Sequence, residues 1–192
     1  MAKNRLLISA LVLALVQVGF LTWIIASRAM ILRYGQEVLL KVEPVDPRDL
    51  LRGDYVSLGY EISNVPARLV VNRGDASSSM EGPIHVRLKK GADGFWHPAS
   101  AALAPGFADA PADGEVDVLG TVSSIWTQDE EEVLRVDYGI GRYYLPEGEG
   151  RPIERDMRVR SFGILAAVGK DGMLQIKALM DGNKMLFSEP LY

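Results

Sequence analysis

The hydrophobic residues follow two different patterns along the chain. From Leu6 to Ala26 they form one continuous run, in which 17 of 21 residues are apolar and none is charged. After residue 35 the apolar residues instead alternate with polar ones, in short stretches separated by glycine, proline, asparagine and aspartate. A long apolar run is typical of a membrane-spanning helix, whereas alternation with a period of two is typical of half-buried strands. The sequence therefore predicts an N-terminal helix followed by a β-rich domain.

The apolar run has the length of a membrane anchor. At about 1.5 Å per residue it spans roughly 31 Å, which matches the hydrocarbon core of a bilayer. We interpret Gln17 as a tolerated polar residue rather than a helix-pairing device. A cleaved signal peptide is the competing interpretation, because Lys3 and Arg5 form a basic start and Ser27-Arg28-Ala29 resembles a cleavage site. Signal peptides have apolar cores of only about 7–15 residues, so we favour an uncleaved signal anchor.

The run also divides the chain into parts. We expect a short N-terminal tail at 1–5, a transmembrane anchor at 6–26, a juxtamembrane stem at 27–35 and a β-rich domain at 36–192. The basic residues on the two sides of the anchor are nearly balanced, so the positive-inside rule gives only a weak preference. We expect a single-pass protein of the inner (plasma) membrane, with its short N-terminus in the cytoplasm and its C-terminal domain extracytoplasmic.

The alternating stretches predict many short strands. They lie at residues 36–43, 55–62, 84–90, 116–126, 132–138, 142–145, 163–168, 173–180 and 184–187. In the first of them Val38, Leu40 and Val42 share one face. Asp-Gly pairs at 171–172 and 181–182 favour tight hairpins. We expect loops at 72–83 and 99–114, and short helices at 66–71, where a strand is the alternative, and at 153–160. The fold class is mainly β, an antiparallel β-sandwich or small barrel-like domain with short helices.

Charge and composition exclude several functions. All 25 acidic residues lie after Arg33, so residues 34–192 carry a net charge of −8, which argues against nucleic-acid binding. The chain has no cysteine and only two histidines, His85 and His97, at no metal-ligand spacing, and we expect no metal or cofactor. We interpret the acidic run at 129–132 as a solvated hairpin tip rather than a calcium site.

A motif in the second predicted strand carries a family resemblance. Residues 53–60 read G-D-Y-V-S-L-G-Y and match G-D-Y-x-x-L-x-Y at Gly53, Asp54, Tyr55, Leu58 and Tyr60. With the apolar segment before it, the chain resembles the GDYXXLXY family of bacterial membrane-anchored proteins over about residues 6–187. The resemblance implies an accessory protein beside a polytopic membrane protein, and it implies no established reaction.

The motif also has a structural explanation. Gly53 suits a turn with positive φ, Asp54 can accept backbone N–H groups there, and a buried Tyr60 needs a partner for its hydroxyl. We favour this explanation, and a binding site formed by Arg52, Asp54 and Tyr55 stays open beside it. Further candidate binding residues are Tyr144 and Glu147.

Together these features predict a non-enzymatic, membrane-anchored domain that binds a membrane or cell-envelope partner, such as a polytopic membrane protein. Residues 6–26 would bind the lipid bilayer.

Two enzymatic alternatives stay open. One is a hydrolase-like enzyme that uses carboxylates among Asp49, Asp54, Glu147 and Glu149. The other is a degenerate signal-peptidase-like protein, because Pro47 to Val56 is similar to the signal-peptidase and LexA-like group. Val45-Asp46 stands where that group has a Ser-Met, so the nucleophile would be missing.

Overall fold

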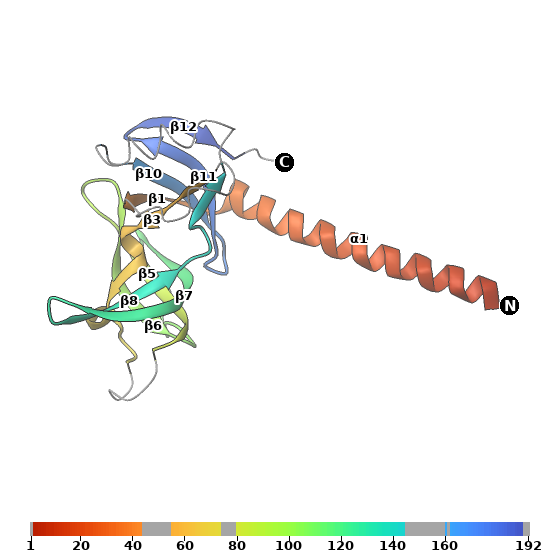
Figure 1. Ribbon diagram of the computed structural model, residues 1–192, viewed down its shortest axis with the longest axis horizontal. Coiled ribbons are helices and arrows are strands. Elements are labelled where there is room, and N and C mark those ends of the chain that lie inside the picture. The colour runs from red at the N-terminus through yellow and green to blue at the C-terminus, as the bar shows by residue number, and fades with distance from the viewer. Residues whose placement is uncertain (1, 44–54, 74–79, 145–159, 161, 190–192) are drawn as a thin grey trace.

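The protein consists of one long N-terminal helix and a β domain, as the computed structural model in Figure 1 shows. The structure describes residues 2–43, 55–73, 80–144, 160 and 162–189. The fold is mainly β, as the sequence predicts. The helix projects away from the domain as a single rod with the N-terminus at its far end (Figure 1).

The helix α1 runs from Ala2–Tyr34 without interruption. It contains a candidate membrane span, Leu7–Tyr34, whose most apolar window is not buried at all inside the protein. The predicted stem is thus helical up to residue 34, because no proline or glycine interrupts it. Gly35 alone separates α1 from the first strand. Its N–H donates to Ile31 O at 2.8 Å, and a Cβ there would lie only 2.5 Å from the same oxygen, so the position favours glycine.

Over the described residues the domain contains two five-stranded antiparallel sheets and a two-stranded ribbon. The first sheet has the order β12-β11-β10-β1-β3, with β1 Gln36–Glu43, β3 Gly59–Tyr60, β10 Phe162–Val168, β11 Leu174–Asp181 and β12 Lys184–Ser188. The second has the order β4-β8-β7-β5-β6, with β4 Asn64–Pro66, β5 Gly82–Lys90, β6 Trp96–Leu103, β7 Glu115–Gln128 and β8 Glu131–Asp137. The ribbon pairs β2 Tyr55–Ser57 with β9 Arg142–Tyr144, and two 3₁₀ turns, η1 Glu61–Ser63 and η2 Ala67–Leu69, flank β4.

One hydrophobic core joins the two sheets. The predicted alternation is confirmed in β1, where Val38, Leu40 and Val42 are buried, and in β5, where the side chains of residues 84, 86 and 88 are fully buried. The predicted turns are also present. Gly172, between β10 and β11, and Gly182, between β11 and β12, both adopt positive φ. Asp129 and Glu130 form the exposed tip of the β7–β8 hairpin.

Three predictions of local structure need correction. The strand predicted at 55–62 is split into two short strands with different partners, since β2 pairs with β9 and β3 pairs with β1. The 3₁₀ turn η1 follows β3 directly. The helix predicted at 66–71 is the 3₁₀ turn η2. Residues 99–103, predicted as loop, belong to β6, because small buried alanines let this segment pair closely with β5. The helix predicted at 153–160 lies outside the described residues except for residue 160.

Candidate functional site

A cleft of about 1120 Å³ lies where α1 meets the β domain. Three segments that are far apart in sequence line it: the last two turns of α1 (27–34), the β10–β11 turn (168–173) and the loop after β6 (105–111). His85 of β5 and Asp117 of β7 also line it. Its volume is that of a ligand-binding pocket, at or slightly above the usual range of about 300–1000 Å³. The cleft is the main candidate site, and sequence reasoning missed it.

The β10–β11 turn is fixed from both sides. It closes on itself through the Gly169 N–H, which donates to Met173 O at 2.8 Å. Gly172 adopts φ +78° and accepts the Leu119 N–H of β7 at 2.9 Å, so the first sheet contacts the second at this point. On the other side Ile31 of α1 packs so close that a Cβ on Gly169 would lie 3.0 Å from its Cγ1.

Arg87 fixes the opposite wall of the cleft. Its guanidinium donates two hydrogen bonds to the carboxylate of Asp117, at 2.7 and 2.9 Å. It also donates to the backbone oxygen of Asp109 at 2.8 Å and to its carboxylate at 3.1 Å. The guanidinium carbon lies 4.1 Å from the ring centre of Phe107. These contacts hold the loop after β6 against the sheet, and they raise the pKa of Arg87, chiefly through Asp117, and lower that of Asp109.

The sequence pattern places Arg87 on the polar face of its strand. That side is correct for the sheet, but the side chain is buried rather than solvated because the loop covers it. Asp117 lies directly opposite on β7, so the pair is visible only once the strand register is known.

The surface of the cleft is more apolar than polar. Met30 and Met173 are exposed and Phe107 is half-buried. His85 is half-buried beside Gly106, and Lys170 is exposed. Among the described residues, no carboxylate forms an ion pair with Lys170. The lining thus joins flexible apolar side chains with the unpaired Lys170, while its two carboxylates accept hydrogen bonds, Asp117 from Arg87 and Asp171 from the Met173 N–H.

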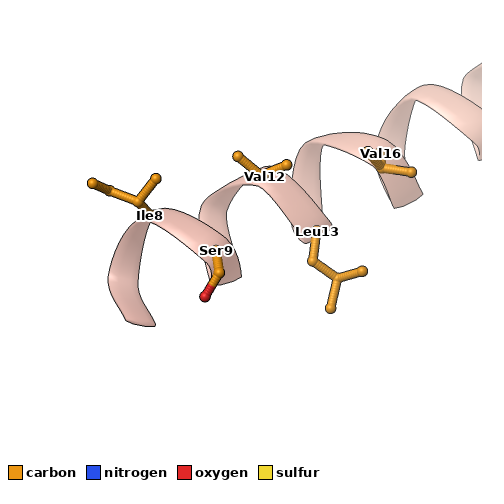
Figure 2. A pocket seen from close by; sticks show the side chains of 5 residues that line it. All are labelled: Ile8, Ser9, Val12, Leu13 and Val16. Carbon is orange, nitrogen blue, oxygen red and sulfur yellow. The ribbon is translucent and has the colours of Figure 1, made fainter. Parts of the chain in front are cut away.

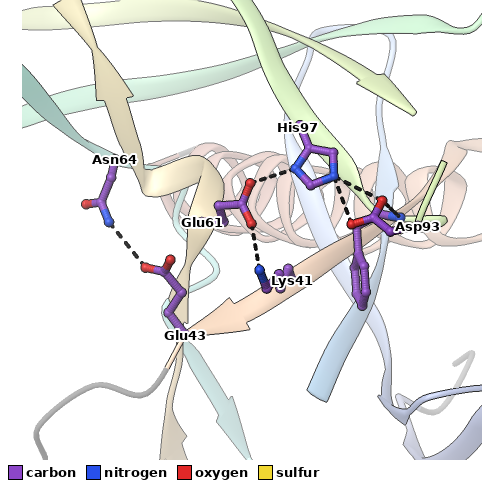
Figure 3. A network of polar contacts seen from close by, with 7 residues as sticks. Lys41, Glu43, Glu61, Asn64, Asp93 and His97 are labelled. Atoms are coloured by element: carbon purple, nitrogen blue, oxygen red, sulfur yellow. Dashed lines mark hydrogen bonds and ion pairs between the residues drawn. The ribbon is translucent and has the colours of Figure 1, made fainter. Parts of the chain in front are cut away.

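A second cluster of charged groups connects the two sheets (Figure 3). His97 of β6 lies between two carboxylates, with Nδ1 at 2.6 Å from Glu61 Oε1 and Nε2 at 3.1 Å from Asp93 Oδ1. Glu61 also binds Lys41 of β1 at 3.2 Å. The hydrogen bonds with Asp93 and then Glu61 raise the pKa of His97. Burial alone would raise the pKa of Glu61, but His97 and Lys41 together lower it.

The ion pairs and hydrogen bonds of this cluster link β1, η1 and β6. Carboxylates at both ring nitrogens favour the doubly protonated imidazolium, which donates in both directions. Sequence reasoning considers His97 only as a metal ligand and discounts it in that role. The signal is absent from the sequence because Glu61 and His97 are 36 residues apart.

The motif residues Leu58 and Tyr60 have structural roles. Both are buried. The Tyr60 hydroxyl donates to Ile140 O at 2.7 Å, and in return the Tyr138 hydroxyl donates to Ile62 O at 2.8 Å. Burial raises the pKa of both tyrosines. The two bonds connect residues 60–62, at the end of the motif, to residues 138–140, which follow β8. The hydroxyl partner that the sequence analysis requires for Tyr60 is therefore present.

The other predicted site residues are only partly visible. Tyr55 and Tyr144 are register partners in the β2–β9 ribbon, and the Tyr144 side chain is exposed. Several candidates lie outside the described residues: Arg52, Gly53, Asp54 and Glu147, together with Asp49 and Glu149 of the hydrolase alternative. No group of three His, Asp or Glu side chains within the described ranges is placed to hold a metal ion.

A shallow groove also lies on α1 itself. Ile8, Val12 and Val16 form one row along the helix, with Ser9 and Leu13 beside it (Figure 2). These residues belong to one helix and to its apolar part, so the groove is the ordinary space between neighbouring ridges of side chains.

An apolar helix long enough to cross a membrane, joined directly to an antiparallel β domain, fits a membrane-anchored domain. The chain belongs to the GDYXXLXY family: the family model described as GDYXXLXY protein matches residues 17–179. The match runs from the middle of α1 into β11 and thus includes the motif and most of the β domain. No curated protein and no solved structure matches the chain.

Proposed function

We propose that the protein is an uncleaved, membrane-anchored domain that binds a component of the same membrane or of the cell envelope in the cleft between α1 and the β domain. The β domain lies on the extracytoplasmic side of the inner membrane. The observation that carries the proposal is that the last two turns of α1 form one wall of the cleft. A binding site built from the anchor is held at the membrane surface.

The packing of α1 supports an anchor over a cleaved signal peptide. Leu32 is buried against the domain, and Ile31 contacts the β10–β11 turn. The cleavage site suggested by Ser27-Arg28-Ala29 lies within the turns that line the cleft. Cleavage there would remove Ser27 from the wall of the site. Only about one turn of α1 would then remain attached to the domain.

The two carboxylates in the cleft support binding rather than catalysis by paired carboxylates. Acid–base catalysis needs titratable groups that can reach a substrate. Asp117 is held by both bonds from Arg87, and Asp171 accepts the Met173 N–H at 3.1 Å. Tethering also confines both binding partners to one membrane, which raises their effective concentration and lets a weak interface suffice.

Site-specific photocrosslinking in living cells tests the site. The photoreactive amino acid p-benzoylphenylalanine is placed at Met173 in the cleft or, as a matched control, at Met185 on β12; these side chains are 47% and 52% exposed. We expect a covalent adduct, with protein or lipid, at residue 173 and none at residue 185. No adduct, or the same adducts at both positions, would contradict the proposed site.

The same crosslinking experiment can also test the motif residues. The triple variant Arg52→Ala, Asp54→Ala and Tyr55→Ala tests the predicted motif site. Loss of the residue-173 adduct in a folded triple variant would place the binding determinants in the motif. Persistence of the adduct would leave the cleft as the site.

The proposed orientation has its own test. A C-terminal alkaline phosphatase fusion should be active and a C-terminal GFP fusion dark, because the two reporters function on opposite sides of the membrane. The reverse result would place the β domain in the cytoplasm.

A further inference from the structure

The position of the cleft along α1 relates it to the layers of a bilayer. The apolar run ends at Ala26, and the first cleft residue is Ser27. Residues 27–34 rise by about 12 Å, which exceeds the roughly 5–8 Å of headgroup region on each side of a bilayer. The cleft therefore begins at the hydrocarbon boundary and extends through the headgroup layer. A molecule could enter it from the membrane without crossing water.

The lining suits a flexible apolar chain. Met30, Met173 and Phe107 supply apolar surface from all three segments that form the cleft. Methionine side chains adapt to irregular and mobile partners because they are unbranched and polarisable. An acyl chain requires only such contacts and needs no hydrogen bonds inside the cleft.

The lining is poorly suited to an extended peptide. Such a peptide binds best along a free strand edge, where it continues the ladder of hydrogen bonds. His85 and Val168 lie on strands that have partners on both sides. On β7, the N–H of Leu119 is already bonded to Gly172. At residues 116–118 β7 pairs with β5 alone, so within the described residues the cleft offers only short stretches of backbone for pairing.

The charges next to the cleft complement an anionic headgroup. Lys170 lines the cleft without an ion pair among the described residues, and the neighbouring Asp171 carboxylate accepts the Met173 N–H. Arg28 and Arg33 are exposed on the same two turns of α1, and residues 1–33 contain no acidic residue. Basic side chains next to a membrane helix attract anionic lipids. The basic region is confined to the level of the membrane, whereas the rest of the domain is acidic.

We propose that the cleft binds one anionic glycerophospholipid from the surrounding membrane, with an acyl chain against Met30, Phe107 and Met173 and the phosphate at Lys170. This inference rests on the proposed function, because it names the class of molecule that occupies the same cleft. The cleft then receives its ligand by lateral diffusion within the bilayer.

Photolabelling of the purified full-length protein tests the inference. The protein is reconstituted into vesicles of phosphatidylcholine that contain a trace of phosphatidylglycerol or phosphatidylcholine with a diazirine in one acyl chain. We expect phosphatidylglycerol to label peptides that contain residues 105–111 and 168–173, in addition to the lipid-exposed part of α1. Labelling confined to α1 would overturn the inference.

Matched variants identify the determinants. Met173→Glu places a charge among apolar groups and should lower labelling of the cleft at least about fivefold, whereas Met185→Glu on β12 should leave it unchanged. Lys170→Glu should remove the preference for phosphatidylglycerol over phosphatidylcholine, and Lys184→Glu should preserve it. Equal labelling in Met173→Glu and Met185→Glu would show that the label does not occupy the cleft.

The two proposals fail in different ways. If the residue-173 photocrosslink in cells yields only a protein adduct and the vesicles show no cleft labelling, the proposed function stands and the lipid is excluded. If neither experiment modifies the cleft, both proposals fail.

Discussion

Replacing Arg87 by methionine tests the wall of the cleft most directly. Methionine keeps most of the aliphatic stem but removes all four hydrogen bonds to Asp117 and Asp109. The ring of Phe107 also loses its cation. The loop after β6 would then be held by fewer contacts, and the carboxylate of Asp117 would be left without its partner.

The structure sets the size of the effect. Breaking a buried ion pair by removing one partner costs about 3–5 kcal/mol. The side chain of Arg87 is 9% exposed and that of Asp117 is 22% exposed, so water can partly solvate the remaining carboxylate. We therefore expect the lower end, about 3 kcal/mol. For a domain of about 150 residues this corresponds to a decrease in Tm of roughly 6–12 °C.

The assay is thermal unfolding of the detergent-solubilised full-length protein, followed by circular dichroism. Lys89→Met is the control, because Lys89 lies two residues away on the same strand and pairs with Glu115 of β7 at 3.9 Å in an exposed position. Exposed pairs contribute about 0–1 kcal/mol, so its Tm should change little. Equal changes in Tm for the two variants would refute the view that Arg87 fixes the loop.

Three further predictions concern the other polar contacts and the helix junction. Tyr60→Phe leaves a buried carbonyl without its donor and should lower the free energy of unfolding by about 1–2 kcal/mol, measured with urea; an unchanged value would refute the role of the hydroxyl. His97 has a raised pKa in the folded state, so its contribution to stability is complete below about pH 6.5 and is lost as the pH rises through the folded-state pKa. Tm measured from pH 6 to pH 9 should therefore depend less on pH in His97→Gln, and parallel curves would contradict this. Gly35→Ala brings a Cβ within 2.5 Å of a helix carbonyl oxygen and should cost about 1–3 kcal/mol, whereas Gly141→Ala, with its nearest atom at 3.9 Å, should be nearly neutral in the same thermal assay.

Local patterns in the sequence predict those helices and strands whose conformation does not depend on contacts with distant segments. The apolar run defines the helix, and alternation in 36–43 and 84–90 identifies β1, β5 and their buried faces. The strand at 99–103 was missed because three of its five residues are alanine, which has low β propensity. Its pairing with β5 and its burial override that propensity.

The candidate site could not be predicted in the same way, because it depends on strand register and on contacts between distant segments. Arg87 meets Asp117 across 30 residues of sequence, and the cleft combines segments near positions 30, 107 and 170. The alternation around Arg87 indicates which face of the strand it occupies but not that a loop covers this face. By contrast, the need for a partner at Tyr60 follows from its expected burial alone.

The direct junction at Gly35 couples the orientation of the β domain to that of α1, the membrane anchor that we propose. No linker allows the domain to reorient, since α1 ends at Tyr34 and β1 starts at Gln36. Membrane helices tilt by about 20° on average, and the tilt depends on how the apolar length matches the thickness of the bilayer. In the proposed anchor, a change in that tilt would therefore also change the orientation of the β domain. Bilayer thickness would thus set the angle at which the whole domain stands above the lipid.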